Sequence, residues 1–186
     1  KFWVKPKTPM WAAGNDEWDR HYSGYHRALD AAAGNPPKGG GRPGKSLLEW
    51  DAYVWDELPA TVSTRTPPYI TQQELSNITT WKLKRGKWRP RLQALVNSNE
   101  DAAVREASAA AFARVDADPG AAIDALCDLK GVGPATAAAV LAMLRSDVAF
   151  MSDELLRTVP AMNGQLKYTK KVFLTLLDES RKKAAE

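Results

Sequence analysis

The chain has 186 residues, 44% of them hydrophobic and 26% charged, which is typical of a globular protein with a sizeable core. The formal net charge is +4, and the single cysteine, Cys127, excludes an internal disulfide and a cluster held by several cysteines. No apolar run approaches the ~18 residues of a membrane span, and no signal-peptide pattern opens the chain. We therefore expect an intracellular monomer, nuclear in a eukaryotic cell, with no membrane contact.

Residues 1–69 have the character of an N-terminal extension, and residues 70–186 that of the main domain. The extension begins with aromatic and apolar residues at the spacing i, i+4, i+7 and i+11, which predicts one face of a helix. These residues are Trp18, Tyr22, Tyr25 and Leu29. Aromatic stripes of this kind mostly pack against a neighbouring surface, and the alternative is stacking on nucleic-acid bases.

A Gly- and Pro-rich stretch at about residues 34–45 is typical of a flexible linker. Within it, residues 39–46 match the phosphate-loop pattern G-x-x-x-x-G-K-[ST], which would predict nucleotide binding that depends on Lys45. That loop needs a buried strand directly before it, whereas prolines and an alanine-rich helix precede it here. Ser46 and Glu49 instead form a capping box that opens a helix, so nucleotide binding is the least supported hypothesis.

Three prolines in residues 59–69 predict a second break, after which the main domain begins. Thr71 and Glu74 form another capping box, and the helix that they open continues to Trp81. Further helices are expected to start at Pro90, to be capped by Asn99, and to start at Asp118-Pro119 and Thr169. No stretch has the character of a strand, so the fold class is all-α.

The densest basic segment, residues 81–91, holds six cations and two tryptophans around Gly86. Interleaved cations and aromatics favour contact with nucleic acid, with Trp81 or Trp88 near an extruded base. The alternative is a solvated charged face that the tryptophans anchor. The cations assigned to DNA contact are Lys82, Lys84, Arg85, Lys87, Arg89 and Arg91.

Residues 126–141 hold two apolar helix segments joined by a Gly-Val-Gly corner. Gly131 and Gly133 can adopt positive φ and let another backbone come close, and Pro134 suits the first turn of a helix. Amides at a helix N-terminus favour a phosphate. We therefore expect the corner to contact the DNA backbone through Lys130, Gly131, Val132, Gly133, Ala135 and Thr136.

This corner resembles the helix-hairpin-helix of DNA-repair proteins, and more closely that of the helix-hairpin-helix (HhH-GPD) DNA glycosylase superfamily. In that family an aspartate follows the hairpin. Asp153 lies eighteen residues after Ala135, the separation between lysine and aspartate in endonuclease III. The resemblance covers residues 70–186 as a helical layout and is sharp across residues 126–157. It implies an all-α, helix-hairpin-helix DNA glycosylase-like domain with a helical, Trp-rich N-terminal extension.

The resemblance also implies roles for single residues. Asp153 would be the catalytic carboxylate that stabilises positive charge on the sugar, and Arg157 would lie at the base pocket with the tryptophans. The alternative for Asp153 is an ordinary acid at a helix start, capped by Ser152 and paired with Arg157. Bifunctional relatives carry a lysine nucleophile where this chain has Ala135, so a lyase reaction through that position is not expected.

Together these features predict a monofunctional DNA glycosylase that flips a damaged base out of double-stranded DNA and hydrolyses its glycosidic bond. The alternative is a non-catalytic, structure-specific DNA-binding protein that kept the hairpin and lost the chemistry. No metal site is expected, since His21 and His26 are too few and too poorly placed for zinc. An iron–sulfur cluster is not expected either, and the one cofactor left open is a monovalent cation at the hairpin backbone.

Overall fold

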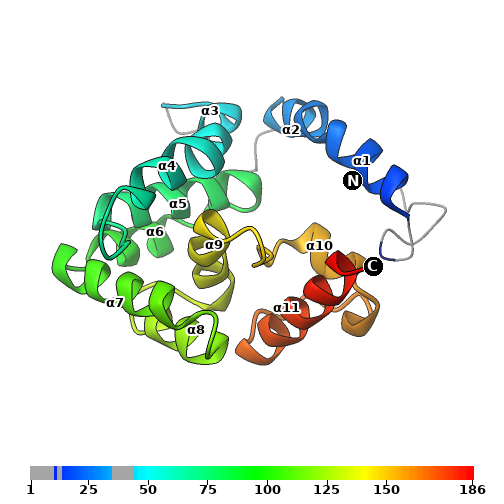
Figure 1. Cartoon of the computed structure of the whole chain (residues 1–186). Helices are drawn as coiled ribbons and strands as arrows, with labels where there is room; N and C mark the ends of the chain where they lie inside the picture. Colours follow the sequence, from blue (N-terminus) through cyan, green and yellow to red (C-terminus); the bar gives the residue numbers. More distant parts are fainter. Residues whose placement is uncertain (1–10, 12–13, 35–43) are drawn as a thin grey trace.

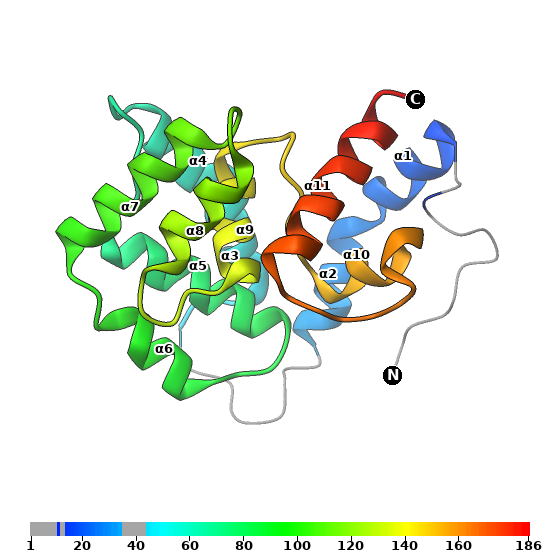
Figure 2. The same cartoon turned by 90° about the horizontal axis from the view of Figure 1, so that it is seen from below.

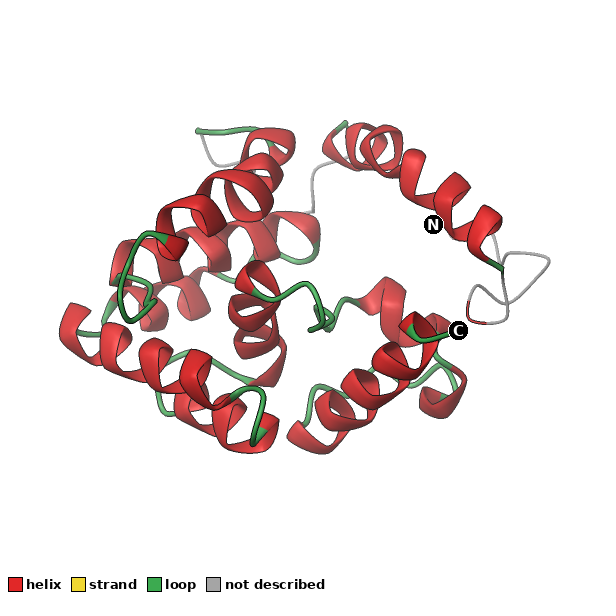
Figure 3. Ribbon diagram, in the orientation of Figure 1, coloured by secondary structure: helices red, strands yellow, loops and turns green. Residues whose placement is uncertain are grey.

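A computed structural model describes residues 11, 14–34 and 44–186. In this part of the chain the secondary structure is helical and no strand is present (Figure 3), which confirms the all-α class. None of the described helices is long and apolar enough to cross a membrane. Most of the linker at residues 34–45, and with it most of the phosphate-loop pattern, lies outside the described residues.

The helices are shown in Figure 1 and, from below, in Figure 2. In chain order they are α1 (Asn15–Ser23), α2 (Tyr25–Ala33), α3 (Leu47–Ala52), α4 (Leu58–Ser63), α5 (Gln72–Arg85), α6 (Pro90–Asn97), α7 (Asp101–Arg114), α8 (Pro119–Cys127), α9 (Pro134–Leu144), α10 (Asp153–Thr158) and α11 (Lys170–Ala184). A π-helical turn, Tyr53–Glu57, joins α3 to α4, and a 3-10 turn, Pro160–Met162, follows α10. Both predicted capping boxes, at Ser46 and at Thr71, are present.

The core is organised around α9, which is buried continuously from Ala135 to Met143. It contacts α4, α5, α7, α8 and α11, and it lies in the middle of the helices in Figure 1. Alanine has the highest helix propensity, and its small side chain lets neighbouring backbones come close. Pro134 begins the helix, where its missing N–H costs nothing. The sequence of α9 therefore specifies both a helix and a buried position.

The core runs across residue 69, because Val54, Leu58 and Val62 are fully buried with the apolar residues of the main domain. The predicted break at Pro59 is wrong, since α4 continues through it to Ser63. A proline inside a regular α-helix clashes with the carbonyl four residues earlier and removes one hydrogen bond. The preceding π-helical turn widens the helix there, which accommodates the proline without ending the helix.

The aromatic face predicted in the N-terminal extension is confirmed in part: Trp18 and Tyr25 are half-buried and Leu29 lies in the core, but Tyr22 is exposed. The chain forms two helices that meet at Gly24, whose N–H bonds to the carbonyls of Arg20 and His21 and closes α1. Tyr22 is 82% exposed, whereas Leu29 is 5% exposed and belongs to the core.

A buried carboxylate, that of Asp51 on α3, connects the N-terminal helices to α5. Asp51 is 5% exposed and accepts hydrogen bonds from Trp81 Nε1 at 2.8 Å and from the Tyr25 hydroxyl at 2.9 Å. Arg85 supplies the balancing charge at 3.2 Å. Buried charges are stable only when paired and hydrogen-bonded, so these four groups depend on one another. We refer to them as the Asp51 cluster.

Replacing Asp51 with alanine should lower the free energy of unfolding by about 3–5 kcal/mol, because it leaves the part-buried Arg85 without a counter-charge and the Trp81 N–H without an acceptor. Urea denaturation measures this loss. The matched control is Asp178→Ala, which removes an exposed carboxylate from an ion pair with Lys182 and should leave stability unchanged. A loss below about 1 kcal/mol for Asp51→Ala would show that the cluster is not a structural anchor.

Candidate functional site

Segments that are far apart in the sequence enclose one cavity of about 510 Å³. They are the end of α5, the loop from α5 to α6, the turn between α8 and α9, and the start of α10. This volume is within the range of small-molecule and base-sized sites. Five basic side chains line the cavity against two acidic ones, so it favours an anionic ligand. The basic residues are Lys82, Arg85, Lys87, Arg89 and Arg157, and the acidic ones are Asp153 and Glu154.

The two glycines of the α8–α9 turn (residues 128–133) have different roles. Gly131 has φ +75°, and a Cβ there would lie 3.0 Å from side-chain atoms of Leu95 and Val96. A glycine is therefore required at position 131 both for its positive φ and for the close approach of neighbouring side chains. Gly133 has an extended backbone with φ −116°, and a Cβ there would meet nothing within 4 Å. Because Gly133 lines the cavity, this open space lies on the cavity side.

The turn is held by Asn99, in a role that the sequence did not reveal. The predicted helix cap at Asn99 is wrong, because Glu100 is the N-cap residue of α7. The Asn99 side chain instead pairs with the backbone of Lys130, accepting from its N–H at 2.8 Å and donating to its carbonyl at 2.9 Å. The Asn99 side-chain amide also donates to the Val96 carbonyl at 2.8 Å, which attaches Asn99 to the end of α6.

Some backbone N–H groups of the turn have a hydrogen-bond acceptor and others have none. Val132 donates to the Leu129 carbonyl at 3.1 Å, and Thr136 donates to the Gly133 carbonyl at 2.8 Å. Val132 is 7% exposed and Thr136 is 3% exposed, although Thr136 lines the cavity, so with their amides occupied these two residues offer less to a phosphate than their neighbours. Among the described residues no acceptor pairs with the remaining amides, those of Gly131, Gly133 and Ala135. Such clustered donors suit a phosphate.

Asp153 is the first residue of α10 and lines the cavity with the turn. Ser152 caps the helix by accepting from the Leu155 N–H at 3.1 Å, and Arg157 lies 3.9 Å from the Asp153 carboxylate. Both features of an ordinary helix-start acid are therefore present. A further bond comes from Tyr168, whose hydroxyl donates to Asp153 Oδ1. Sequence reasoning missed Tyr168, which is an isolated aromatic in an irregular segment.

The environment of Tyr168 keeps it a hydrogen-bond donor. Burial, the hydrogen bond to Asp153 and the negative charge of that residue raise the pKa of the Tyr168 phenol to about 12. The phenol therefore stays protonated throughout the physiological range and can hold one carboxylate oxygen in place. The other oxygen faces Arg157. Asp153 is thus oriented by two groups while its side chain remains half-exposed to the cavity.

The assignment of Trp81 to a base pocket is wrong, since its side chain is fully buried and hydrogen-bonded to Asp51. Its ring packs edge-on against Trp55, with centroids 5.3 Å apart, and at a tilt of 46° against Phe150, with centroids 5.1 Å apart. Phe150 lines the cavity, as does Tyr168. Trp88 is half-buried and lies outside the cavity lining.

The six cations of the basic segment do not form one strip. Arg85 lines the cavity but ion-pairs with Asp51, and Lys84 donates to the Lys45 carbonyl at 2.6 Å on another face of α5. Arg91 is exposed on α6 outside the cavity lining, as is Lys130 at the tip of the turn. The remaining cations line the cavity: Lys82, Lys87 and Arg89.

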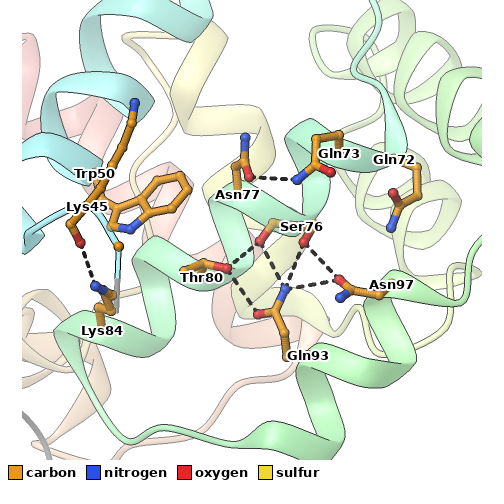
Figure 4. Close-up of a pocket in the computed structure, with 11 residues that line it drawn as sticks. Lys45, Trp50, Gln72, Gln73, Ser76, Asn77, Thr80, Lys84, Gln93 and Asn97 are labelled. Atoms are coloured by element: carbon orange, nitrogen blue, oxygen red, sulfur yellow. Dashed lines mark hydrogen bonds between the residues drawn. The ribbon is translucent and has the colours of Figure 1, made fainter. Parts of the chain in front are cut away.

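A second cavity, of about 380 Å³, lies between α5 and α6 on the side where Lys84 points (Figure 4). Its floor is a polar network centred on Gln93, which is 2% exposed. The Gln93 amide donates to Ser76 Oγ at 2.9 Å and to Asn97 Oδ1 at 3.1 Å, and its carbonyl accepts from Thr80. These side chains supply one another's hydrogen-bond partners, so the network fixes α6 against α5. Because α6 leads into Asn99, the same network helps to position the α8–α9 turn.

No three His, Cys, Asp or Glu side chains of the described residues are grouped to hold a metal ion. Cys127 is partly buried, and burial raises the pKa of its thiol to about 11, which makes it a poor nucleophile. No family model matches the chain, and no curated protein or solved structure matches it. The function is therefore inferred from the residues and their geometry.

Replacement of the two glycines of the turn should have unequal effects on stability. Gly131→Ala should lower the free energy of unfolding by about 2 kcal/mol or more, because the methyl group meets Leu95 and Val96 at an unfavourable φ. Gly133→Ala is the matched control and should change it by less than about 0.5 kcal/mol. Urea denaturation of both variants measures the difference. Equal losses would contradict the described turn.

Proposed function

We propose that the protein binds double-stranded DNA and hydrolyses the N-glycosidic bond of a damaged base that has been extruded from the helix. One observation carries this proposal. A single cavity brings together the free amides of the α8–α9 turn, a basic loop, an aromatic side chain and an oriented carboxylate. The resemblance of residues 126–157 to the HhH-GPD DNA glycosylases supports the same function independently of the cavity.

DNA would be held by its phosphates. The free amides of Gly131, Gly133 and Ala135 are donors of fixed geometry, and they can bind a phosphate whatever the base sequence is. Lys87 and Arg89 at the cavity, with Lys130 at the tip of the turn, add positive charge that displaces counterions from the DNA. The open space beside Gly133 lets a phosphodiester come close to the backbone.

An extruded base would enter the cavity against Phe150. Base flipping costs a few kcal/mol and costs least at a damaged or mismatched pair, which contributes to selectivity. Stacking of the base on an aromatic ring offsets part of that free-energy cost. Phe150 is suited to this because Trp81 supports its ring from the core. The aromatic platform is therefore fixed before the base arrives.

Asp153 would supply the chemistry. Cleavage of an N-glycosidic bond builds positive charge on the sugar, and a fixed carboxylate beside the sugar stabilises that charge. The same carboxylate can accept a proton from the attacking water. Tyr168 holds one oxygen by a hydrogen bond, and the other oxygen lies 3.9 Å from Arg157, too far for a hydrogen bond, so it can still accept one from a water molecule.

The second candidate is a DNA-binding protein without catalysis. It is favoured by the Ser152 cap and by the proximity of Arg157 to Asp153, which are what an ordinary helix-start acid would show. Both candidates share the contact between the α8–α9 turn and phosphate. They differ in the role of Asp153, which takes part in release of a base in the first candidate and only begins a helix in the second.

Asp153→Asn separates the candidates. Incubation with duplexes that carry a panel of damaged bases, followed by alkali, reveals abasic sites as strand breaks. We expect base release by the wild-type protein to fall by about 10²- to 10⁴-fold in the variant, while DNA affinity stays the same. Asp178→Asn, an exposed position in the middle of α11, is the control. Binding without any abasic product across the whole panel would leave the non-catalytic candidate.

Lys130→Ala tests the phosphate contact. Affinity for duplex DNA should fall uniformly across sequences, and the slope of log affinity against log salt should decrease by about 1. Fluorescence anisotropy at several salt concentrations measures both quantities. Lys182→Ala, which removes an ion-paired lysine of α11, should change neither. If Lys130→Ala binds like the wild type, the turn does not contact DNA.

A further inference from the structure

The cavity of about 380 Å³ between α5 and α6 is separate from the cavity that holds Asp153, because the two have no lining residue in common. Its lining contains two lysines and one tryptophan, and its other side chains are amides and hydroxyls. No aspartate or glutamate is found among the described residues that line it. The volume is within the range of small-molecule sites. This composition favours a small anion that also carries hydrogen-bonding groups.

The positive charge of this cavity is concentrated where the start of α3 lies beside the end of α5 (Figure 4). Lys84 Nζ donates to the Lys45 carbonyl at 2.6 Å, and the Lys45 ammonium lies 5.6 Å from the centre of the Trp50 ring. Neither lysine forms an ion pair with a described residue. Glu49 is also near, and its pKa is lowered by the hydrogen bond that it accepts from the Ser46 N–H at 2.6 Å and, to a smaller extent, by both lysine charges. Because Glu49 lies outside the lining, two ammonium groups remain for an anion such as a phosphate.

Side-chain amides of α5 have hydrogen-bonding capacity that the fold does not use. Gln73 Nε2 donates to Asn77 Oδ1 at 3.0 Å, and Asn77 Nδ2 donates to the Tyr53 hydroxyl at 3.1 Å. Within the described part of the chain, no group pairs with the Gln73 side-chain carbonyl or with the second N–H of either amide. An amide presents a donor and an acceptor side by side, which matches the edge of a nucleobase. The half-buried Trp50 ring lines the same cavity and offers an aromatic surface for stacking.

Two residues that line this cavity, Gly44 and Lys45, belong to the phosphate-loop pattern of residues 39–46. The cavity does not have the geometry of that loop. Ser46 Oγ accepts from the Glu49 N–H at 3.2 Å and caps α3, and the described residues contain no strand that could precede such a loop. Lys45 is instead joined by Lys84 from a distant part of the chain. Its suitability for a phosphate therefore follows from the tertiary structure and not from the pattern.

We propose that the cavity between α5 and α6 binds a nucleoside monophosphate. The phosphate lies at Lys45 and Lys84, and the base lies against Trp50 and the amides of Gln73 and Asn77. This site does not rest on the proposed function, because it uses no residue of the cavity that holds Asp153. It is a site of binding, and no chemical step is assigned to it.

Isothermal titration calorimetry of the full chain with AMP, GMP, CMP and UMP, each without DNA, tests the proposal. At least one of the four should bind saturably. Ribose 5-phosphate should bind at least about tenfold more weakly than that nucleotide, because it lacks a base to stack. Failure of all four to bind at about 10 mM overturns the site. Equal affinity for ribose 5-phosphate overturns the assignment of a nucleoside.

Lysine variants test the phosphate contact. Lys45→Met and Lys84→Met should each weaken binding of the nucleotide by at least about tenfold, because each removes a charge that faces the phosphate. Lys182→Met, at an exposed position of α11, is the control and should bind like the wild type. Thermal unfolding checks that the variants are folded, and the exposed Lys45 decides the question if Lys84→Met is not. Wild-type affinity in the folded lysine variants contradicts the proposal.

The indole N–H signals of isotope-labelled tryptophan locate the nucleotide. The Trp50 signal, assigned by its loss in Trp50→Phe, should shift on titration with the nucleotide. A shift of the Trp81 signal without a shift of the Trp50 signal would place the ligand at the other cavity, where Trp81 supports Phe150, and would refute the site. Because DNA is absent throughout, these results are independent of whether the protein releases a damaged base.

Discussion

The buried carboxylate of Asp51 is the interaction on which the cavity depends. It fixes Trp81, and Trp81 supports Phe150, the aromatic wall of the site. The same carboxylate neutralises Arg85 at the end of α5 and holds Tyr25 of the N-terminal extension. An unpaired charge in this buried position would lower the stability of the fold, so loss of any one of these groups weakens the contribution of the others. The N-terminal extension is in this sense part of the structure that shapes the site.

The remaining walls are positioned by polar contacts across the core. Gln93 fixes α6 on α5, and Asn99 at the end of α6 holds the backbone of Lys130. The turn between α8 and α9 is therefore attached to the basic segment through α6 and not through its own helices alone. Tyr168 makes a similar link from an irregular segment to Asp153. Side-chain amides and one phenol thus set the relative placement of groups that come from four parts of the chain.

Local signals in the sequence predicted the local structure well. The capping boxes at Ser46 and Thr71, the all-α class and the helix starting at Pro90 follow from rules that span a few residues. The misassigned residues depend on partners far along the chain. The hydrogen-bond acceptor of the buried Trp81 side chain lies thirty residues earlier in the chain. The backbone that the Asn99 side chain binds lies thirty-one residues later. Neither partner can be identified from spacing or composition. The placement of Asp153 in the cavity agrees with its expected register to the turn, while its chemistry stays a prediction.

The continuous burial of α9 has a consequence for how the site can diverge. Nearly every position of this helix contacts a neighbouring helix, so mutation there is constrained by packing on all sides. The α5–α6 loop and the segment that carries Phe150 face the cavity from the other sides and contain exposed or half-exposed residues. Substitutions in those two walls can therefore change the shape and charge of the cavity without disturbing the packing of α9. This division of walls favours the evolution of different ligand preferences around one unchanged helix.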